Sequence, residues 1–367
     1  MKKQELLHRM EDGAITRRQV NRLLAAAGVA LVAMPVTRRT AEAAGDQATF
    51  FTWAGYDTPD FFAPYVKKHG KPNTPVFADE QEAFQKLHAG FVADVAHPCS
   101  GRLVRWRDAG LIQPMDTSKL SNFGDLYPVL TKINTADLDG KQWFAPIDWG
   151  NTGVLYRTDK VEPKEDSYSL LWDERYKGSM SMGEDITDTA IIGGLYVGVK
   201  DPYAMNDSDI EKVKQALLKQ KPLLRFYWSD TTVLEQAIAS GEVVVSTAWN
   251  GTLAKMLDQG IPARFMKPKE GMLTWCCGAV LTKNAPHPDL AHDMIDALIS
   301  KEAGVWMINY GYGHSNRKAI AEAGAKKVER LGLPADPEEF LKTGVFSRDN
   351  KRLADLQKMF ESVKAGI

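Results

Sequence analysis

Large aromatic side chains recur in this sequence where strand-like runs end. They are Trp53, Tyr56, Trp149, Trp249, Trp275 and Tyr312, and acids accompany them at Asp148, Asp185 and Asp188. Aromatic faces attract ammonium groups, and carboxylates form strong hydrogen bonds with them. In α/β folds, ligands bind beyond the carboxyl ends of the strands. The pattern therefore indicates a site for a small cationic molecule, although a single tryptophan is more typical of an apolar core.

Asp185 and Asp188 are three residues apart, so both face one side of the start of a helix. Such a pair fits acid–base cleavage of a glycoside, but capping of a helix and complementing its dipole is the commoner role. The sequence has no Gly-rich phosphate loop, no His-Glu-x-x-His and no G-x-S-x-G motif, and its seven histidines are not spaced as a metal pair. We therefore expect a binding protein and no enzyme, without a metal or a cofactor.

The elements that must position these side chains are organised around residues 143–156. An apolar run leads to Asp148-Trp149, the chain then passes Gly150, Asn151 and Gly153, and a strand-like run resumes. Glycine allows a bend. We predict a strand interrupted by glycine that crosses between two lobes, where a ligand cleft forms. An ordinary strand–turn–strand with a surface tryptophan is the alternative.

Strand-like and helix-like segments alternate along the chain. Apolar, β-branched runs at 48–53, 75–77, 93–97, 178–182, 242–249 and 274–281 are separated by segments of helical periodicity. The length of 367 residues exceeds what one compact core holds. We predict an α/β fold with two lobes, each a mixed sheet flanked by helices.

The first residues have the character of an export signal. A charged segment with Arg17-Arg18 precedes a short apolar run, and Ala41-Glu42-Ala43 fits a cleavage site. The paired arginines indicate the twin-arginine route to the periplasm; an N-terminal anchor helix is the alternative. Removing residues 1–43 leaves 38 basic and 43 acidic residues, a formal net charge of −5. No basic stripe indicates nucleic acid as a partner.

Seven short segments, in this order, carry a resemblance to a known family. They lie at 51–56, 108–113, 146–150, 174–179, 248–251, 268–271 and 311–312. As a set they resemble the periplasmic spermidine/putrescine-binding proteins of ABC transporters, over nearly all of the mature chain. The resemblance implies two lobes, at 46–150 plus 276–320 and at 151–275 plus 321–367. It also implies an inner-membrane permease with its ATPase as a partner, and we expect a monomer.

The resemblance also implies roles for individual residues. Trp53, Tyr56, Trp249, Trp275 and Tyr312 match positions that box the alkyl chain of an amine. Asp185 matches an ammonium-binding acid, and Asp188 falls where the family often has Glu. The sequence departs from the family at two positions on the same wall of the pocket. Cys99-Ser100-Gly101 replaces a ligand-contacting segment, and Cys277 replaces an acid. Cys99 and Cys277 should lie close together, either as a disulfide or as two small buried thiols.

The expected function is therefore delivery of a small cationic amine, of the putrescine/spermidine class, to a permease. We predict that the ligand contacts Trp53, Tyr56, Cys99, Ser100, Asp148, Trp149, Asp185, Asp188, Trp249, Trp275, Cys277 and Tyr312. The alternative is the same fold with a zwitterionic or anionic ligand, such as an aminophosphonate or a carboxylate. Arg102 and the helix start at Ser100-Gly101 would then hold the anionic group.

Overall fold

The computed structural model describes residues 47–133, 136–333, 338 and 344–367. The predicted signal segment, 1–43, lies outside the described residues. Residues 46–367 form one compact unit. Its strands are β1 (Phe50–Trp53), β2 (Val76–Phe77), β3 (Val95–Ala96), β4 (Ile112–Gln113), β5 (Asp137–Leu138), β6 (Lys141–Gln142), β7 (Ala145–Arg157), β8 (Met180–Gly183), β9 (Leu224–Trp228), β10 (Val245–Trp249), β11 (Ala263–Phe265), β12 (Leu273–Thr282), β13 (Gly313–His314) and β14 (Val345–Phe346).

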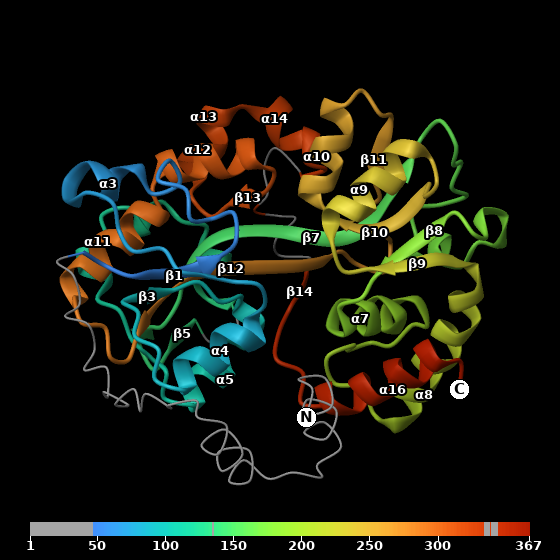
Figure 1. Ribbon diagram of the computed structural model, residues 1–367, viewed down its shortest axis with the longest axis horizontal. Helices are drawn as coiled ribbons and strands as arrows, with labels where there is room; N and C mark the ends of the chain where they lie inside the picture. Colours follow the sequence, from blue (N-terminus) through green and yellow to red (C-terminus); the bar gives the residue numbers. More distant parts are fainter. Residues whose placement is uncertain (1–46, 134–135, 334–337, 339–343) are drawn as a thin grey trace, which may run out of the picture. The chain divides into compact units, whose positions relative to one another are not determined.

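Helices cover both ends of this strand assembly (Figure 1). They are α3 (Ala63–His69), α4 (Glu80–His88), α5 (Leu103–Asp108), α6 (Pro128–Thr131), α7 (Ile186–Tyr196), α8 (Asp207–Gln220), α9 (Thr231–Ser240), α10 (Asn250–Asp258), α11 (Pro288–Leu298), α12 (Lys301–Tyr310), α13 (Arg317–Ala323), α14 (Ala325–Arg330) and α16 (Leu353–Ala365). Five of these helices, α4, α7, α9, α10 and α13, begin within three residues of the end of a strand, in line with the alternation that the sequence predicts.

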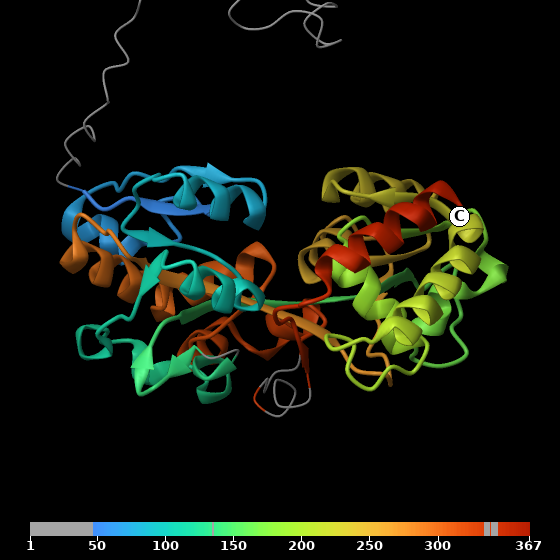
Figure 2. The ribbon, with the colours of Figure 1, turned by 90° about the horizontal axis from the view of Figure 1, so that it is seen from below.

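Two long antiparallel strands, β7 and β12, connect two groups of parallel strands. The strand order is β2-β1-β3-β12-β7-β10-β8-β9. β3 pairs with the end of β12, whereas β10 pairs with the second half of β7. Figure 2 shows β7 (green) and β12 (orange) passing between the two groups. The predicted two-lobed mixed α/β fold is confirmed.

The apolar cores follow this division. Two clusters join residues before Gly150 to residues after Trp275, and two others lie within 154–273, one of which also includes α16. Val328 and Leu331 pack in the cluster that contains Phe51 and Trp106, although they fall in the segment 321–367 that the sequence assigned to the second lobe. The other lobe boundaries stay a prediction.

The crossing strand differs from the sequence prediction in one respect. β7 runs without interruption from Ala145 to Arg157, so the glycines do not bend it. They make room instead. A Cβ on Gly150 would lie 2.5 Å from Cζ2 of Trp275, and a Cβ on Gly153 would lie 2.5 Å from Cε1 of Phe265. Both distances are too short, so bulky aromatic rings from neighbouring strands require glycine here.

Replacing Gly150 should therefore disturb the packing of Trp275 over β7. We expect Gly150→Ala to lower the free energy of unfolding by about 1–3 kcal/mol, as overpacking does. Gly124→Ala is the matched control, because nothing lies within 4 Å of the added Cβ. Denaturant unfolding measures both. Equal losses in the two variants would contradict this account of the strand.

Candidate functional site

A cavity of about 410 Å³ lies over the two connecting strands. Both halves of the fold contribute to it. Its aromatic lining is Trp53, Tyr56, Trp249, Trp275, Tyr310 and Tyr312, and its charged lining is Glu80, Arg102, Asp148, Asp185, Asp188, Glu235, Lys255 and Arg348. The cavity thus combines aromatic faces with more acidic than basic side chains.

Strand register places much of the floor of the cavity. Side chains alternate along a strand, so Asp148, Gly150 and Thr152 of β7 share one face. Across from these residues, β12 presents Cys277 opposite Asp148 and Trp275 opposite Gly150. β10 presents Trp249 opposite Thr152. Since directly paired residues face the same side, residues from three distant segments come together on one surface.

The aromatic rings contact one another in a chain around the cavity. Trp275 and Tyr312 meet edge to face, with centroids 5.2 Å apart. Tyr310 lies 6.0 Å from Tyr312 and 5.7 Å from Tyr56. Tyr312 directly precedes β13, which pairs with β7, so the sheet sets its position. These rings form a wall suited to an alkyl chain that ends in an ammonium group.

Asp148 is buried and holds Tyr56 in place. The Tyr56 hydroxyl donates to Oδ2 of Asp148 at 2.9 Å, and Nε2 of His97 lies 3.0 Å from Oδ1. His97 in turn contacts the Thr52 hydroxyl through Nδ1 at 2.9 Å. Burial, together with the charge of Asp148, raises the pKa of Tyr56. Each oxygen of Asp148 is therefore already engaged by the protein.

The first turn of α7 brings two further carboxylates to the cavity. Asp185 caps the helix, and its Oδ1 accepts from the backbone N–H of Asp188 at 3.1 Å. The capping role expected for acids at a helix start is thus confirmed for Asp185. Oδ2 of Asp188 accepts from the hydroxyl of Thr152 at 2.7 Å. Burial, followed by the negative charge of Asp185, raises the pKa of Asp188 to about 7.

Glu80 is a site residue that sequence reasoning missed. Its Oε1 accepts from the backbone N–H of Cys99 at 2.6 Å, and its Oε2 accepts from Nε of Arg102 at 3.3 Å. Burial raises the pKa of Glu80 to about 7, despite the opposing effect of Arg102. One signal could have found it, because Glu80 begins the helix that follows β2, the same strand-to-helix position that marked the other acids.

Cys99 and Cys277 form a disulfide across 178 residues. Of the two alternatives that the sequence left open, the bonded pair is therefore correct, and the bridge lines the cavity. It joins the turn before Ser100–Arg102 to β12. Cys276 is free and buried, and it pairs with Trp149 on the opposite face of the sheet. Burial raises the pKa of its thiol, so it is a poor nucleophile.

Two predicted site residues do not line the cavity. Trp149 follows Asp148 directly and so points to the other face of β7, where its indole N–H donates to the carbonyl of His314 at 3.2 Å. It is fully buried. Ser100 is also buried and is not part of the lining, although its neighbours Cys99 and Gly101 are. The other ten predicted residues line one cavity, and their contact with a ligand stays a prediction.

Comparison with known proteins decides the family. The model of the bacterial extracellular solute-binding proteins matches residues 62–333. The chain belongs to this family. A putrescine/agmatine-binding protein of Pseudomonas aeruginosa is 29% identical over 292 residues, covering 72% of this chain and 78% of the relative.

Solved structures share the fold of this solute-binding protein at low sequence identity. A spermidine/putrescine substrate-binding protein of Streptococcus pneumoniae has a TM-score of 0.74 at 19% identity, covering 88% of this chain and 99% of its own. A binding protein of A. tumefaciens B6 in complex with glucopine has a TM-score of 0.69 at 15% identity, covering 87% and 99%. The fold is therefore shared among proteins with different ligands.

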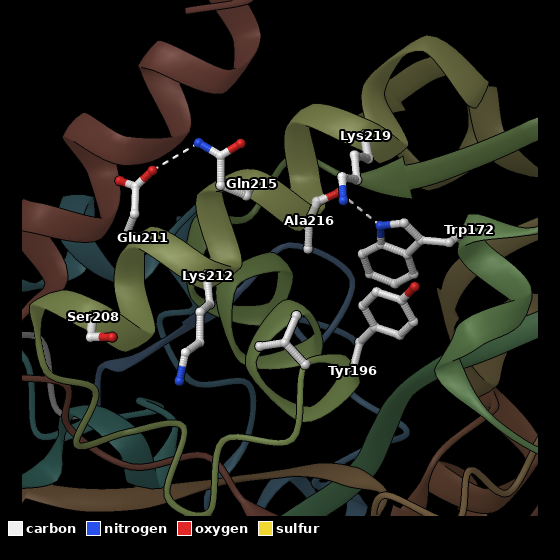
Figure 3. A pocket seen from close by; sticks show the side chains of 9 residues that line it. Trp172, Tyr196, Ser208, Glu211, Lys212, Gln215, Ala216 and Lys219 are labelled. Carbon is white, nitrogen blue, oxygen red and sulfur yellow. Dashed lines mark hydrogen bonds between the residues drawn. The ribbon is translucent and has the colours of Figure 1, made fainter.

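A second hollow of the solute-binding protein lies on α8 and beside the end of α7, and its volume is about 510 Å³ (Figure 3). Trp172 and Tyr196 stack there at 3.8 Å, and the indole N–H of Trp172 donates to the carbonyl of Ala216 at 2.8 Å. Gln215 donates to Glu211 within the same helix. Glu211 is the single acid of this lining and accepts that bond, so the hollow has no counterpart of the paired acids Asp185 and Asp188. We therefore take the cavity over β7 as the candidate site.

Among the described residues, no group of three or more His, Cys, Asp or Glu side chains is arranged to hold a metal ion. In the same segments, no helix combines the length and apolar character that crossing a bilayer requires.

The disulfide predicts a thiol count. Denatured in the absence of reductant, the protein should expose one reactive thiol, that of Cys276, and three after reduction. Three thiols before reduction would contradict the bridge. The variant Cys99→Ala/Cys277→Ala should lose roughly 2–4 kcal/mol of stability, because a bridge over so long a loop restricts the unfolded chain. Reagent titration and denaturant unfolding measure the two effects.

Asp188 predicts a pH-dependent stability of the ligand-free protein. Its pKa in the folded state, about 7, lies above the unfolded value near 4, so stability falls as pH rises between these values. Asn keeps an acceptor for Thr152 but cannot ionise. We expect Asp188→Asn to stabilise the protein at pH 8 by on the order of 1–2 kcal/mol, and by less at pH 4.5. Thermal melts measure it; Glu184→Gln, which removes an exposed neighbouring acid, should not reproduce the gain.

Proposed function

We propose that this solute-binding protein captures a small cationic amine, of the putrescine/spermidine class, and delivers it to the permease of an ABC importer. It acts in the periplasm after export by the twin-arginine route, as a monomer, and without chemistry of its own. The observation that carries the proposal is the single cavity in which aromatic rings from both halves surround Asp185 and Asp188.

The ion pairs at the cavity do not include these two acids, and the charge of Arg102 offsets only part of the rise in the pKa of Asp188. Arg102 pairs with Glu80, Lys255 pairs with Glu235 at 3.1 Å, and Arg348 pairs with Asp201. Within the described segments, no basic side chain forms an ion pair with Asp185 or Asp188. Two close carboxylates in a partly buried site repel each other, and an ammonium group between them would relieve that repulsion.

The aromatic lining supplies the rest of the affinity. Trp275 and Tyr312 offer apolar area to an alkyl chain and electron-rich faces to its charged end. Names of relatives agree with this reading, since the relative from Pseudomonas aeruginosa is a putrescine/agmatine-binding protein. The glucopine complex shows that the same fold also serves another kind of ligand. A zwitterionic or anionic ligand is the second candidate, supported by Arg102 in the cavity wall.

The proposal predicts strong losses from two substitutions. Linear primary amines are screened by thermal shift, with putrescine as the first probe, and those that bind are titrated by calorimetry. Asp185→Asn should weaken amine binding about 10- to 100-fold, because a hydrogen bond to a charged group is worth about 1.5–3 kcal/mol. Asn remains a good helix cap, so α7 should persist. Trp275→Ala should weaken binding at least as much.

Glu184→Gln is the matched control, since Glu184 neighbours the cap but pairs with Lys364 at 2.9 Å away from the cavity. It should leave the affinity within about twofold. Unchanged affinity in both Asp185→Asn and Trp275→Ala would remove this cavity as the amine site.

A further inference from the structure

Three carboxylates of the cavity form one electrostatic group with a single guanidinium. Oε2 of Glu80 accepts from Nε of Arg102 at 3.3 Å. The charge of Asp185 acts on Glu80, and the charges of Asp185 and Arg102 both act on Asp188. All four side chains line the cavity, and we call them the acid cluster. Fully ionised, the cluster has three negative charges and one positive charge, a net charge of −2.

The other basic side chains of the cavity lining are paired outside this cluster. Lys255 pairs with Glu235 at 3.1 Å, and Arg348 pairs with Asp201. Among the described residues that line the cavity, Arg102 is therefore the basic side chain that is paired within the cluster. One guanidinium cannot balance three carboxylates, so the cluster lacks positive charge.

The surroundings of the cluster limit its contact with water. The side chains of Glu80 and Arg102 are only 18% and 21% exposed. Aromatic rings and the uncharged disulfide make up much of the remaining lining. The protein supplies neutral donors, the N–H of Cys99 to Glu80 at 2.6 Å and the hydroxyl of Thr152 to Asp188 at 2.7 Å. Carboxylates that share a poorly solvated site repel one another, and such groups hold protons instead of ionising together.

Two phenols lie near enough to Asp188 for its charge to act on them. They are Tyr168 and Tyr203, and burial raises the pKa of both, so they stay neutral and add no positive charge. Burial, followed for Asp188 by the charge of Asp185, also raises the pKa of Asp188 and of Glu80 to about 7. The protonation of these two acids therefore changes near neutral pH.

A cationic ligand and a bound proton serve the same purpose in such a cluster. Each supplies positive charge that the carboxylates lack, so an ammonium group that enters the cavity favours the ionised acids. Because linkage is reciprocal, binding of the cation must then release protons, and a fall in pH must weaken binding. An anionic ligand has the opposite effect, since it favours the protonated acids.

We propose that the cation binds in exchange for protons held by Glu80 and Asp188, so that this solute-binding protein loses affinity as its surroundings become acidic. Glu80 is thereby a further specificity-determining residue. Arg102 is a positioning residue, which holds Glu80 and limits the number of protons in the cluster. The inference rests on the proposed function, because it takes the positive charge of the ligand from it.

Calorimetry with putrescine on the full mature protein tests the inference, because amines of this kind stay charged between about pH 6 and pH 8. Titrations in buffers of different ionisation enthalpy give the number of protons released. We expect about 0.5–1.5 protons at pH 6.5 and fewer than about 0.3 at pH 8, since acids with a pKa of about 7 are mostly protonated at the first pH and mostly ionised at the second. For the same reason, the affinity should fall at least about 10-fold from pH 8 to pH 6.

Two variants assign the protons to the named acids. Glu80→Gln and Asp188→Asn each remove one carboxylate that holds a proton, so each should lower the number released at pH 6.5 by roughly half and make the affinity less dependent on pH. Glu184→Gln is the matched control, because Glu184 is an exposed acid that pairs with Lys364 outside the cavity lining. It should leave the proton count unchanged.

Arg102→Gln tests the role of the guanidinium. Without this positive charge the cluster binds protons more tightly, so the loss of affinity should set in at a pH that is higher by roughly half a unit or more. A merely structural role of Arg102 would lower the affinity equally at every pH and leave that midpoint in place.

The wild-type titrations alone can overturn the inference, even if a variant folds poorly. Putrescine that binds with equal affinity at pH 6 and pH 8, and without releasing protons at pH 6.5, would contradict the exchange and leave the proposed function intact. If neither putrescine nor another linear amine of the thermal-shift screen binds at either pH, the proposed function fails and the inference fails with it.

Discussion

The candidate site depends on the alternation of side chains along β7 and on the register of its neighbours. A strand presents successive residues to opposite faces, so Asp148, Gly150 and Thr152 share the face toward the cavity, and Asp148 lines it. Pairing with β12 and β10 then adds Cys277, Trp275 and Trp249 to the same face. A shift of the strand register by one residue would place Trp149 instead of Asp148 on the cavity face, and it would turn Trp275 to the opposite face of the sheet. Glycine at 150 completes the arrangement, because the indole of Trp275 occupies the space of a side chain.

Burial gives this surface its unusual electrostatics. Burial and mutual repulsion raise the pKa of Asp188, and burial raises that of Glu80, both to about 7. The fold tolerates these unfavourable charges because each carboxylate keeps a hydrogen-bond donor from the protein, Thr152 in one case and the Cys99 backbone in the other. The unfavourable ionisation of these acids and the binding of a cation that we propose would thus be two consequences of one arrangement.

The disulfide has a structural and a chemical consequence. It joins the turn that carries Gly101 and Arg102 to β12, and so ties a lobe element to a connecting strand. Gly101 approaches Ser347 so closely that a Cβ would lie 2.8 Å from its Oγ, which shows how tightly this turn meets the chain's C-terminal segment. The same bridge gives the cavity an uncharged stretch of wall, and the oxygens of Asp148 and Glu80 in that cavity are engaged by protein donors.

Much of the architecture and of the site followed from the sequence alone. Periodicity indicated the strands and helices, and aromatic residues at strand ends, with the acids near them, indicated eight residues that line one cavity, because both signals are local. The resemblance to the family implied the other two, Cys99 and Cys277. The sequence could not show that Trp149 points away from the cavity while Asp148 lines it, since only strand pairing decides which face of β7 packs against the core. It could not reveal Glu80, whose burial depends on Cys99 and Arg102, nor choose between a bridge and two thiols for residues 178 positions apart. The residue types suited to a ligand are therefore visible in the local sequence. The face that each side chain occupies, the residues around it and its charge state were decided by tertiary contacts, because burial and strand register exist only once distant strands have paired.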